Sequence, residues 1–182
     1  MVYLFLAEGF EEIEALTPVD LLRRADIEVC TVGIGDTDVC GAHGITVKAD
    51  IDEATALYYL EEKGAEMIIL PGGMPGSTNL DKSETVDDFL CYARENGTPY
   101  AAICAAPFVL GKRGMLENKK AVCYPGFEDE LRGATIVNEG TVRDGNTVCG
   151  RAMGSAIDFA LQIITLLRGS EAAEKIKKAI IY

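Results

Sequence analysis

The alternation of short apolar segments with helical patterns constrains the fold of this chain more than any other feature. Met67–Leu70 and Tyr100–Ile103 are apolar runs of four residues. Amphipathic stretches lie between such runs, for example Val86–Asn96, where Gly97 is placed to end the helix. Strands that alternate with helices are typical of a parallel α/β sheet. We therefore expect one doubly wound domain over residues 1–182.

The remaining expected elements extend this alternation. Thr17 is suited to cap a helix, and Pro18 is suited to its first position because proline lacks an N–H group. Asp144-Gly145-Asn146 is typical of a hairpin turn. The expected strands are Val2–Leu6, Glu28–Val32, Ile45–Val47, Ala121–Cys123, Thr141–Arg143 and Thr147–Cys149, and the expected helices are Thr17–Arg24, Thr55–Lys63, Ala106–Lys112, Met153–Leu167 and Ser170–Lys178.

Charge and cysteine usage exclude several classes of protein. The net charge of −12 opposes binding to nucleic acid or to an anionic membrane surface. No apolar stretch approaches the roughly 20 residues of a membrane span, and the N-terminus lacks the basic start of a signal peptide. The six cysteines form no C-x-x-C pair. We expect a cytoplasmic protein whose thiols are free.

Cys104 is the first candidate for chemistry. It ends the apolar run Tyr100–Ile103, and a helix is expected directly after it. A sharp turn from strand to helix pushes one side chain out of the sheet, so a thiol at this point is suited to act as a nucleophile. The start of a helix also lowers the pKa of a nearby thiol, which ordinarily lies near about 8.5. The alternative, a buried and inert cysteine, suits Cys30, Cys91 and Cys149 better.

Two further segments follow strands, and sites in open α/β sheets form at the carboxyl ends of the strands. Gly72 and Gly73 permit close approach of the backbone, so an amide there, together with that of Ala105, is suited to hold an oxyanion. The alternative is an ordinary tight turn. Glu14 beside a thiolate is useful only if it is buried and protonated, and an exposed acidic turn explains Glu11 and Glu12 equally well.

A catalytic base is missing from the expected positions. His43 is the only histidine, far from Cys104 in sequence, and a lone histidine of this kind is usually a surface or turn residue. No Ser-His-Asp set and no metal-binding cluster is evident. No glycine-rich nucleotide fingerprint is present either. We therefore expect neither a metal nor a nucleotide cofactor.

At these residues the chain resembles the ThiJ/PfpI superfamily, and within it the branch of the Parkinson-disease-associated protein deglycase. The similarity covers nearly the whole length, in several separated motifs that occur in the right order. They are Gly9-Phe10-Glu11-Glu12-Ile13-Glu14, Pro18-Val19-Asp20 with Arg23-Arg24, Leu70-Pro71-Gly72-Gly73, Ala101-Ala102-Ile103-Cys104-Ala105, and Arg151 with Gly154 and Phe159-Ala160-Leu161.

The resemblance implies a flavodoxin-like, class I glutamine amidotransferase-like α/β sandwich that forms a homodimer. It assigns the reactive cysteine to Cys104 and a protonated glutamate to Glu14. The oxyanion-binding amides fall on Gly73 and Ala105. Activities of the branch are the cofactor-independent conversion of methylglyoxal to lactate and the repair of early glycation adducts. Oxidation of the cysteine to a sulfinate and protection against stress are also implied.

The chain departs from the family pattern near the cysteine. Many members carry a histidine in a short Thr-His-Pro-like segment, and here the segment is Val122-Cys123-Tyr124-Pro125. The Tyr124 phenol donates a hydrogen bond but is a poor base at neutral pH. His43 falls where members often have a basic residue near the dimer interface. Ala106 replaces a frequent glycine.

Three functions follow, in order of preference. In the first, Cys104 adds to a small aldehyde, Glu14 moves a proton between adjacent carbons, and water releases the acid. In the second, the protein is a non-catalytic sensor in which peroxide oxidises Cys104 to a sulfinate. The third, a cysteine peptidase or amidase, requires a Cys–His pair that this chain does not show.

Overall fold

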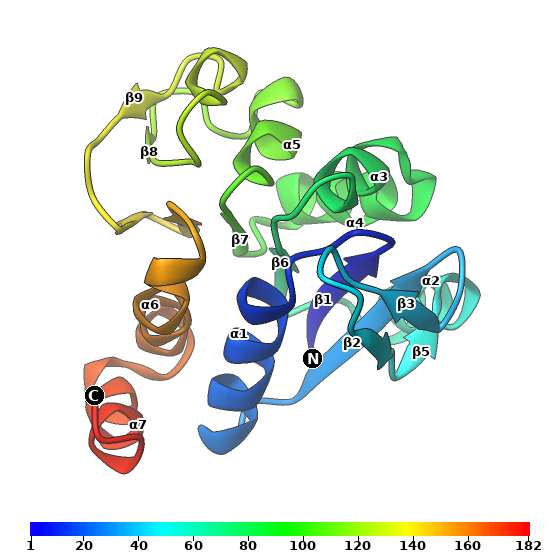
Figure 1. Ribbon diagram of the computed structural model, residues 1–182, viewed down its shortest axis with the longest axis horizontal. Helices are drawn as coiled ribbons and strands as arrows, with labels where there is room; N and C mark the ends of the chain where they lie inside the picture. Colours follow the sequence, from blue (N-terminus) through cyan, green and yellow to red (C-terminus); the bar gives the residue numbers. More distant parts are fainter.

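A computed structural model describes residues 1–182 and has a seven-stranded central sheet (Figure 1). The strand order is β10-β11-β7-β6-β1-β2-β5, and every neighbouring pair is parallel except β10 and β11. The strands are β1 (Val2–Ala7), β2 (Val29–Ile34), β5 (Ile51–Asp52), β6 (Met67–Leu70), β7 (Tyr100–Ile103), β10 (Thr141–Asp144) and β11 (Thr147–Gly150). The expected α/β architecture with a mostly parallel sheet is confirmed.

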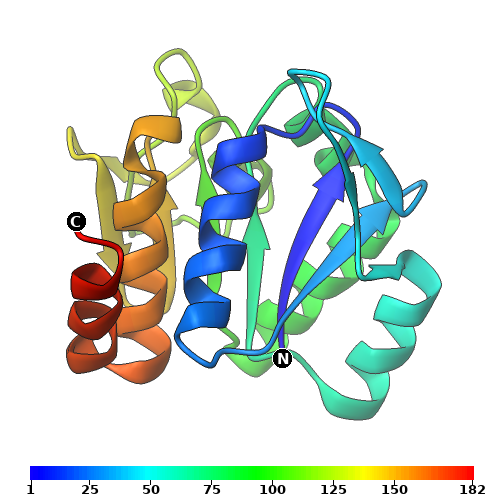
Figure 2. The same cartoon turned by 60° about the horizontal axis from the view of Figure 1, so that its bottom comes forward.

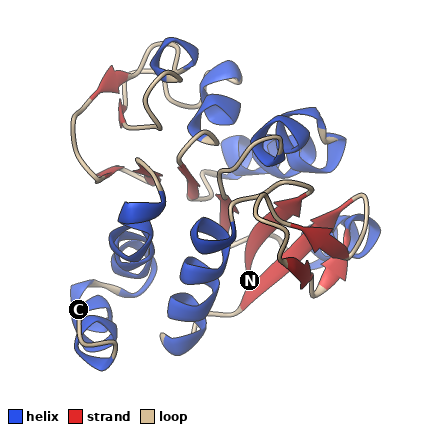
Figure 3. Ribbon diagram, in the orientation of Figure 1, coloured by secondary structure: helices blue, strands red, loops and turns tan.

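Helices cover both faces of this sheet (Figures 2 and 3). The residues of β1, β6 and β7 are all buried, because helices exclude water from both sides. One face packs against α1 (Glu12–Arg24), α6 (Ala156–Arg168) and α7 (Ser170–Ala179); the other packs against α2 (Glu53–Lys63), α3 (Gly76–Lys82), α4 (Glu84–Asn96) and α5 (Pro107–Lys112). None of the helices has the length and apolar character needed to cross a membrane.

Two short two-stranded sheets and two 3-10 turns accompany the central sheet. The hairpin of β3 (Asp38–Cys40) and β4 (Thr46–Lys48) follows β2. The pair β8 (Lys120–Ala121) and β9 (Thr135–Ile136) precedes β10, with the 3-10 turn η1 (Glu128–Glu130) between them. A second 3-10 turn, η2 (Met153–Ser155), follows β11. The expected hairpin turn at residues 144–146 is confirmed, since β10 and β11 are antiparallel across it.

The start of α1 differs from the expectation. The helix begins at Glu12, so Pro18 lies inside it instead of at its first position. The Glu11 carboxylate caps the helix by accepting the Glu14 N–H at 2.7 Å. An acidic cap favours the positive end of the helix and satisfies one of the free N–H groups of its first turn. The early start carries Glu14 on the first helical turn instead of in a loop.

The loops after β1 and β6 meet at the point where the strand order reverses. β1 lies between β2 and β6, and the chain crosses from the β5 edge back to β6. The Glu11 N–H donates to the Gly72 carbonyl at 2.9 Å, which joins the two loops directly. Sites of open α/β sheets form at such a switch point, so the fold places these loops where chemistry is expected.

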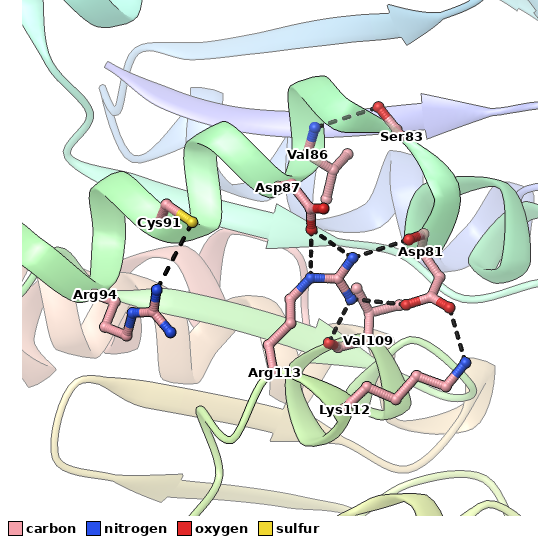
Figure 4. A network of polar contacts seen from close by, with 9 residues as sticks. All are labelled: Asp81, Ser83, Val86, Asp87, Cys91, Arg94, Val109, Lys112 and Arg113. Atoms are coloured by element: carbon pink, nitrogen blue, oxygen red, sulfur yellow. Dashed lines mark hydrogen bonds and ion pairs between the residues drawn. The ribbon is translucent and has the colours of Figure 1, made fainter.

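A charged network holds α5, the helix that follows Cys104 (Figure 4). The Arg113 guanidinium donates to Asp87 Oδ1 at 2.6 Å, to Asp81 Oδ1 at 2.7 Å and to the Asp81 carbonyl at 2.9 Å. Lys112 Nζ lies 2.8 Å from the other Asp81 oxygen. Because Asp81 lies in α3 and Asp87 in α4, the network fixes three helices against one another.

Candidate active site

Cys104 occupies a strained backbone position at the end of β7. Its φ is +65°, in the left-handed region that costs a residue with a side chain roughly 1–2 kcal/mol. Two hydrogen bonds hold it there: its N–H donates to the Gly150 carbonyl at 2.9 Å, and its carbonyl accepts from the Tyr124 N–H at 2.7 Å. The sharp strand-to-helix turn expected from the sequence is therefore present, and it is anchored from both sides.

The pKa of the Cys104 thiol is raised by burial, whereas the sequence predicted that the helix after it would lower this pKa. α5 begins three residues later, at Pro107, and is only six residues long. Burial raises the pKa of the Cys104 thiol to about 12, and a charged Glu14 adds to the increase. The backbone N–H groups of Ala105 and Gly73 act to lower the same pKa, but they do not outweigh burial. Protonation of Glu14 therefore favours ionisation of the thiol by removing the second of these two causes.

Glu14 is almost fully enclosed, with 1% of its surface exposed. Burial raises the pKa of its carboxyl to about 7, while the neighbouring Cys104 side chain acts in the opposite direction. Oε2 is buried without a hydrogen-bond partner. A carboxyl removed from water favours its neutral form, so Glu14 and Cys104 together retain a proton near neutral pH.

Gly72 brings Glu14 and Cys104 together. A Cβ added to Gly72 would overlap both the Glu14 Oε2 atom and the Cys104 Cβ atom. Gly73, with φ of +93°, packs in the same way against the loop after β1. The amides of Gly73 and Ala105 donate to no backbone acceptor. Two free donors therefore flank the sulfur, as an oxyanion would require.

Tyr124 contributes its backbone to the site, and its side chain is half exposed. Gly150 and Tyr124 both hold the turn at Cys104 through hydrogen bonds that involve backbone atoms alone. Sequence reasoning did not find these two contacts, because any residue supplies a backbone N–H or carbonyl. Only the pairing of β11 with β7 brings Gly150 beside the cysteine.

The structure pairs His43 with Glu12 and not with the candidate nucleophile. Its Nδ1 atom lies 2.8 Å from Glu12 Oε2, and its ring is mostly exposed. The hydrogen bond that the His43 ring donates to the Glu12 carboxylate raises the pKa of His43. Glu12 is only 4% exposed, which corrects the expectation of an exposed acidic turn. No hydrogen bond or ion pair joins His43 to Cys104 or Glu14.

The cluster of Glu11, Glu12 and His43 has the composition of a metal site, with ligand atoms within 4.8 Å of one another. Its Glu12 carboxylate already accepts from the His43 N–H at 2.7 Å, from the ring at 2.8 Å and from the Ile45 N–H at 3.5 Å. The Glu11 carboxylate caps α1. The ion pair and the cap explain these residues without a metal.

Arg151 follows Gly150, and hydrogen bonds hold both its backbone and its side chain. Its N–H donates to the Gly140 carbonyl at 2.9 Å, and its guanidinium Nη1 donates to Asn138 Oδ1 at 2.7 Å. It makes no ion pair with a carboxylate. The guanidinium contacts neither Cys104 nor Glu14 by a hydrogen bond, so it lies on the flank of the site.

Comparisons with known proteins extend over the same residues. The family model described as "DJ-1/PfpI family" matches residues 1–166. Protein DJ-1 homolog A of Arabidopsis thaliana is 35% identical over 176 residues, which are 96% of this chain and 44% of that protein, so the chain spans less than half of that relative. The glutathione-independent glyoxalase DJR-1.2 of Caenorhabditis elegans is 28% identical over 173 residues, 94% of this chain and 90% of that one.

A solved structure shares the whole fold. Oxidized Toxoplasma gondii DJ-1 superimposes with a TM-score of 0.92 at 35% sequence identity, over 100% of this chain and 97% of that one.

Proposed function

Because this chain belongs to the DJ-1/PfpI family, we propose that it is a cofactor-independent cysteine enzyme that acts on small reactive aldehydes. The observation that carries the proposal is the position of Cys104, which lies on a strained turn against the buried Glu14 carboxyl. The name of the Caenorhabditis elegans relative, a glutathione-independent glyoxalase, supports aldehyde chemistry at the level of the family.

The first step uses the proton that the Cys104–Glu14 pair retains. With the proton on Glu14, the sulfur is a thiolate and attacks the aldehyde carbon of a 2-oxoaldehyde such as methylglyoxal. The aldehyde oxygen takes up the proton and a hemithioacetal forms. The free amides of Gly73 and Ala105 stabilise the negative charge that develops on that oxygen.

Glu14, now a carboxylate, serves as the base for the second step. It removes the proton from the former aldehyde carbon and returns it to the adjacent carbonyl carbon, which gives a thioester of a 2-hydroxy acid. Water then cleaves the thioester and regenerates the thiol. One carbon is oxidised and its neighbour is reduced, so the reaction needs no external oxidant or cofactor. Repair of an early glycation adduct begins with the same attack by sulfur.

Two variants test this function against methylglyoxal. Cys104→Ala removes the nucleophile and is expected to abolish turnover, and Glu14→Gln is expected to reduce kcat by roughly 100-fold or more, because a general base typically contributes that much. Cys91→Ala is the matched control, since Cys91 is exposed and lies in α4, on the opposite face of the sheet from α1, which carries Glu14. Wild-type turnover in Cys104→Ala would exclude the proposal.

A second candidate function rests on Tyr124. The family resemblance implies a histidine where this chain has Tyr124. The absence of that imidazole base favours a thiol that reacts with peroxide over one that turns over a substrate. Cys104 would then pass through a sulfenate to a sulfinate beside Glu14, gaining two oxygens. Intact-mass measurement after mild peroxide treatment, together with a methylglyoxal assay before oxidation, separates the two functions.

A further inference from the structure

Arg151 is the only lysine or arginine in the loops that follow four central strands. These loops are residues 8–11 after β1, 71–75 after β6, 104–106 after β7 and 151–152 after β11. Their other charged residues are the acids Glu8 and Glu11. A chain of net charge −12 thus places a single arginine, and no lysine, in the loops at the end of the sheet that carries its candidate nucleophile.

Hydrogen bonds of the Arg151 backbone and of its guanidinium group fix the position of this side chain. The Gly150 carbonyl that accepts from the Cys104 N–H at 2.9 Å belongs to the residue directly before Arg151. The Arg151 N–H is bound to Gly140, and its guanidinium to the Asn138 amide oxygen. The side chain is half-buried. A fixed cation loses little conformational freedom when it binds an anion.

The charge of Arg151 is not neutralised within the protein. Arg23, Arg113 and Arg168 each form an ion pair with an aspartate or glutamate, whereas Arg151 has only a neutral amide as its side-chain partner. A guanidinium offers five N–H donors in a planar fork that matches a carboxylate. The Asn138 contact uses one of them, which leaves the others available to a ligand.

The position of the guanidinium suits the tail of a substrate better than its reacting end. Its charge acts against the burial that raises the pKa of the Cys123 thiol to about 11. Cys123 precedes Tyr124, whose N–H binds the Cys104 carbonyl. Arg151 therefore flanks the site on the Tyr124 side, while Gly73 and Ala105 face the sulfur.

We propose that Arg151 binds a carboxylate carried by the substrate and so favours 2-oxoaldehydes with a carboxylate on their chain over neutral methylglyoxal. The choice of substrate rests on the proposed aldehyde function, but the binding of a carboxylate beside Cys104 does not. The reaction is unchanged: R–CO–CHO and water give R–CHOH–COO⁻ and a proton, with the carboxylate on R held by Arg151.

Alkylation of Cys104 by two reagents of nearly equal shape tests the binding directly. Iodoacetate carries a carboxylate and iodoacetamide a neutral amide. The ratio of their rates is expected to fall about three- to tenfold in Arg151→Gln, as the loss of one partly screened charge that attracts the reagent implies. Arg151→Lys should retain part of the preference, because it keeps the charge and loses the fork. Arg143→Gln, which also removes an arginine without an ion pair, is the control and should leave the ratio unchanged.

An unchanged ratio in a folded Arg151→Gln protein overturns the proposal. A measurement on the wild-type protein covers the case in which the variant does not fold. Glutarate should slow the alkylation by iodoacetamide and glutaramide should not; equal protection by both compounds, or by neither, also overturns it.

Turnover gives the second readout. The ratio of kcat/KM for 4,5-dioxopentanoate to that for methylglyoxal should fall in Arg151→Gln by a similar factor. A change in the alkylation ratio without turnover of either aldehyde would retain the carboxylate site and reject the aldehyde function. If both aldehydes are turned over and Arg151→Gln does not change the ratio of their kcat/KM values, the aldehyde function is retained and the carboxylate site is rejected.

Discussion

Glu14 Oε2 and Cys104 Cβ lie against the same α-carbon, that of Gly72, where an added Cβ would overlap both. This contact places a carboxyl with a raised pKa beside a thiol with a raised pKa. A charged Glu14 opposes the ionisation of Cys104, whereas the Cys104 side chain favours the ionisation of Glu14. The two groups are coupled, so the first proton lost belongs to the pair and not to either residue alone. A cysteine paired with an acid in this way differs from one paired with a histidine base.

The pH dependence of stability should report the buried Glu14. Because burial raises its pKa from 4.5 to about 7, the folded protein keeps a proton that the unfolded chain releases between these values. The unfolded state binds fewer protons there, so the free energy of unfolding falls as pH rises from about 4.5 to about 7. Urea unfolding should show wild type losing up to about 3 kcal/mol relative to Glu14→Gln over this range. Parallel curves for the two proteins would contradict the assigned pKa.

Gly72→Ala should damage the site through a single methyl group. The added Cβ overlaps the Glu14 and Cys104 side chains, and overpacking of this kind typically costs about 1–3 kcal/mol. We expect a lower melting temperature and a much slower alkylation of Cys104 by iodoacetamide. Gly154→Ala is the matched control, because a Cβ there meets no atom within 4 Å. Equal effects of the two substitutions would argue against close packing at Gly72.

The exposed apolar face of α1 should form the contact of a homodimer, the assembly that the family resemblance implies. Ile13 is 48% exposed and Leu16 37% exposed, and they line a 540 Å³ groove with Ile45. Sedimentation equilibrium should give twice the chain mass of 19.6 kDa for wild type and the chain mass for Leu16→Asp. Tyr58→Asp changes an exposed apolar residue on α2 and should remain dimeric. A monomeric wild type would reject this interface.

The Arg113 network should contribute more to stability than a surface ion pair. Its side chain is 19% exposed and is shared between Asp81 and Asp87, so Arg113→Ala leaves Asp87 unpaired and leaves Asp81 with Lys112 alone. We expect a loss of about 2 kcal/mol in urea unfolding, less than for a fully buried pair. Arg24→Ala removes an exposed pair with Asp20 and should change stability little. Similar losses in the two variants would contradict the importance of the network.

Local sequence patterns predicted the strands well and the start of α1 poorly. Met67–Leu70 and Tyr100–Ile103 are strands with the expected bounds, because an unbroken apolar run has few alternatives once both faces are covered. Thr17 and Pro18 have the composition of a helix start, but the chain uses Glu11 as the cap. The contact of the Glu11 N–H with Gly72 fixes that choice, and it joins residues 61 positions apart.

The sequence by itself determined the alternation of strands and helices and the turn at Cys104, since both depend on residues close together in the chain. The tertiary structure alone decided the environment of that turn. It enclosed Glu14, raised the pKa of the thiol by burial, paired His43 with Glu12 and left Arg151 without a carboxylate. Solvation and charge depend on which distant segments meet, and local patterns carry no record of that.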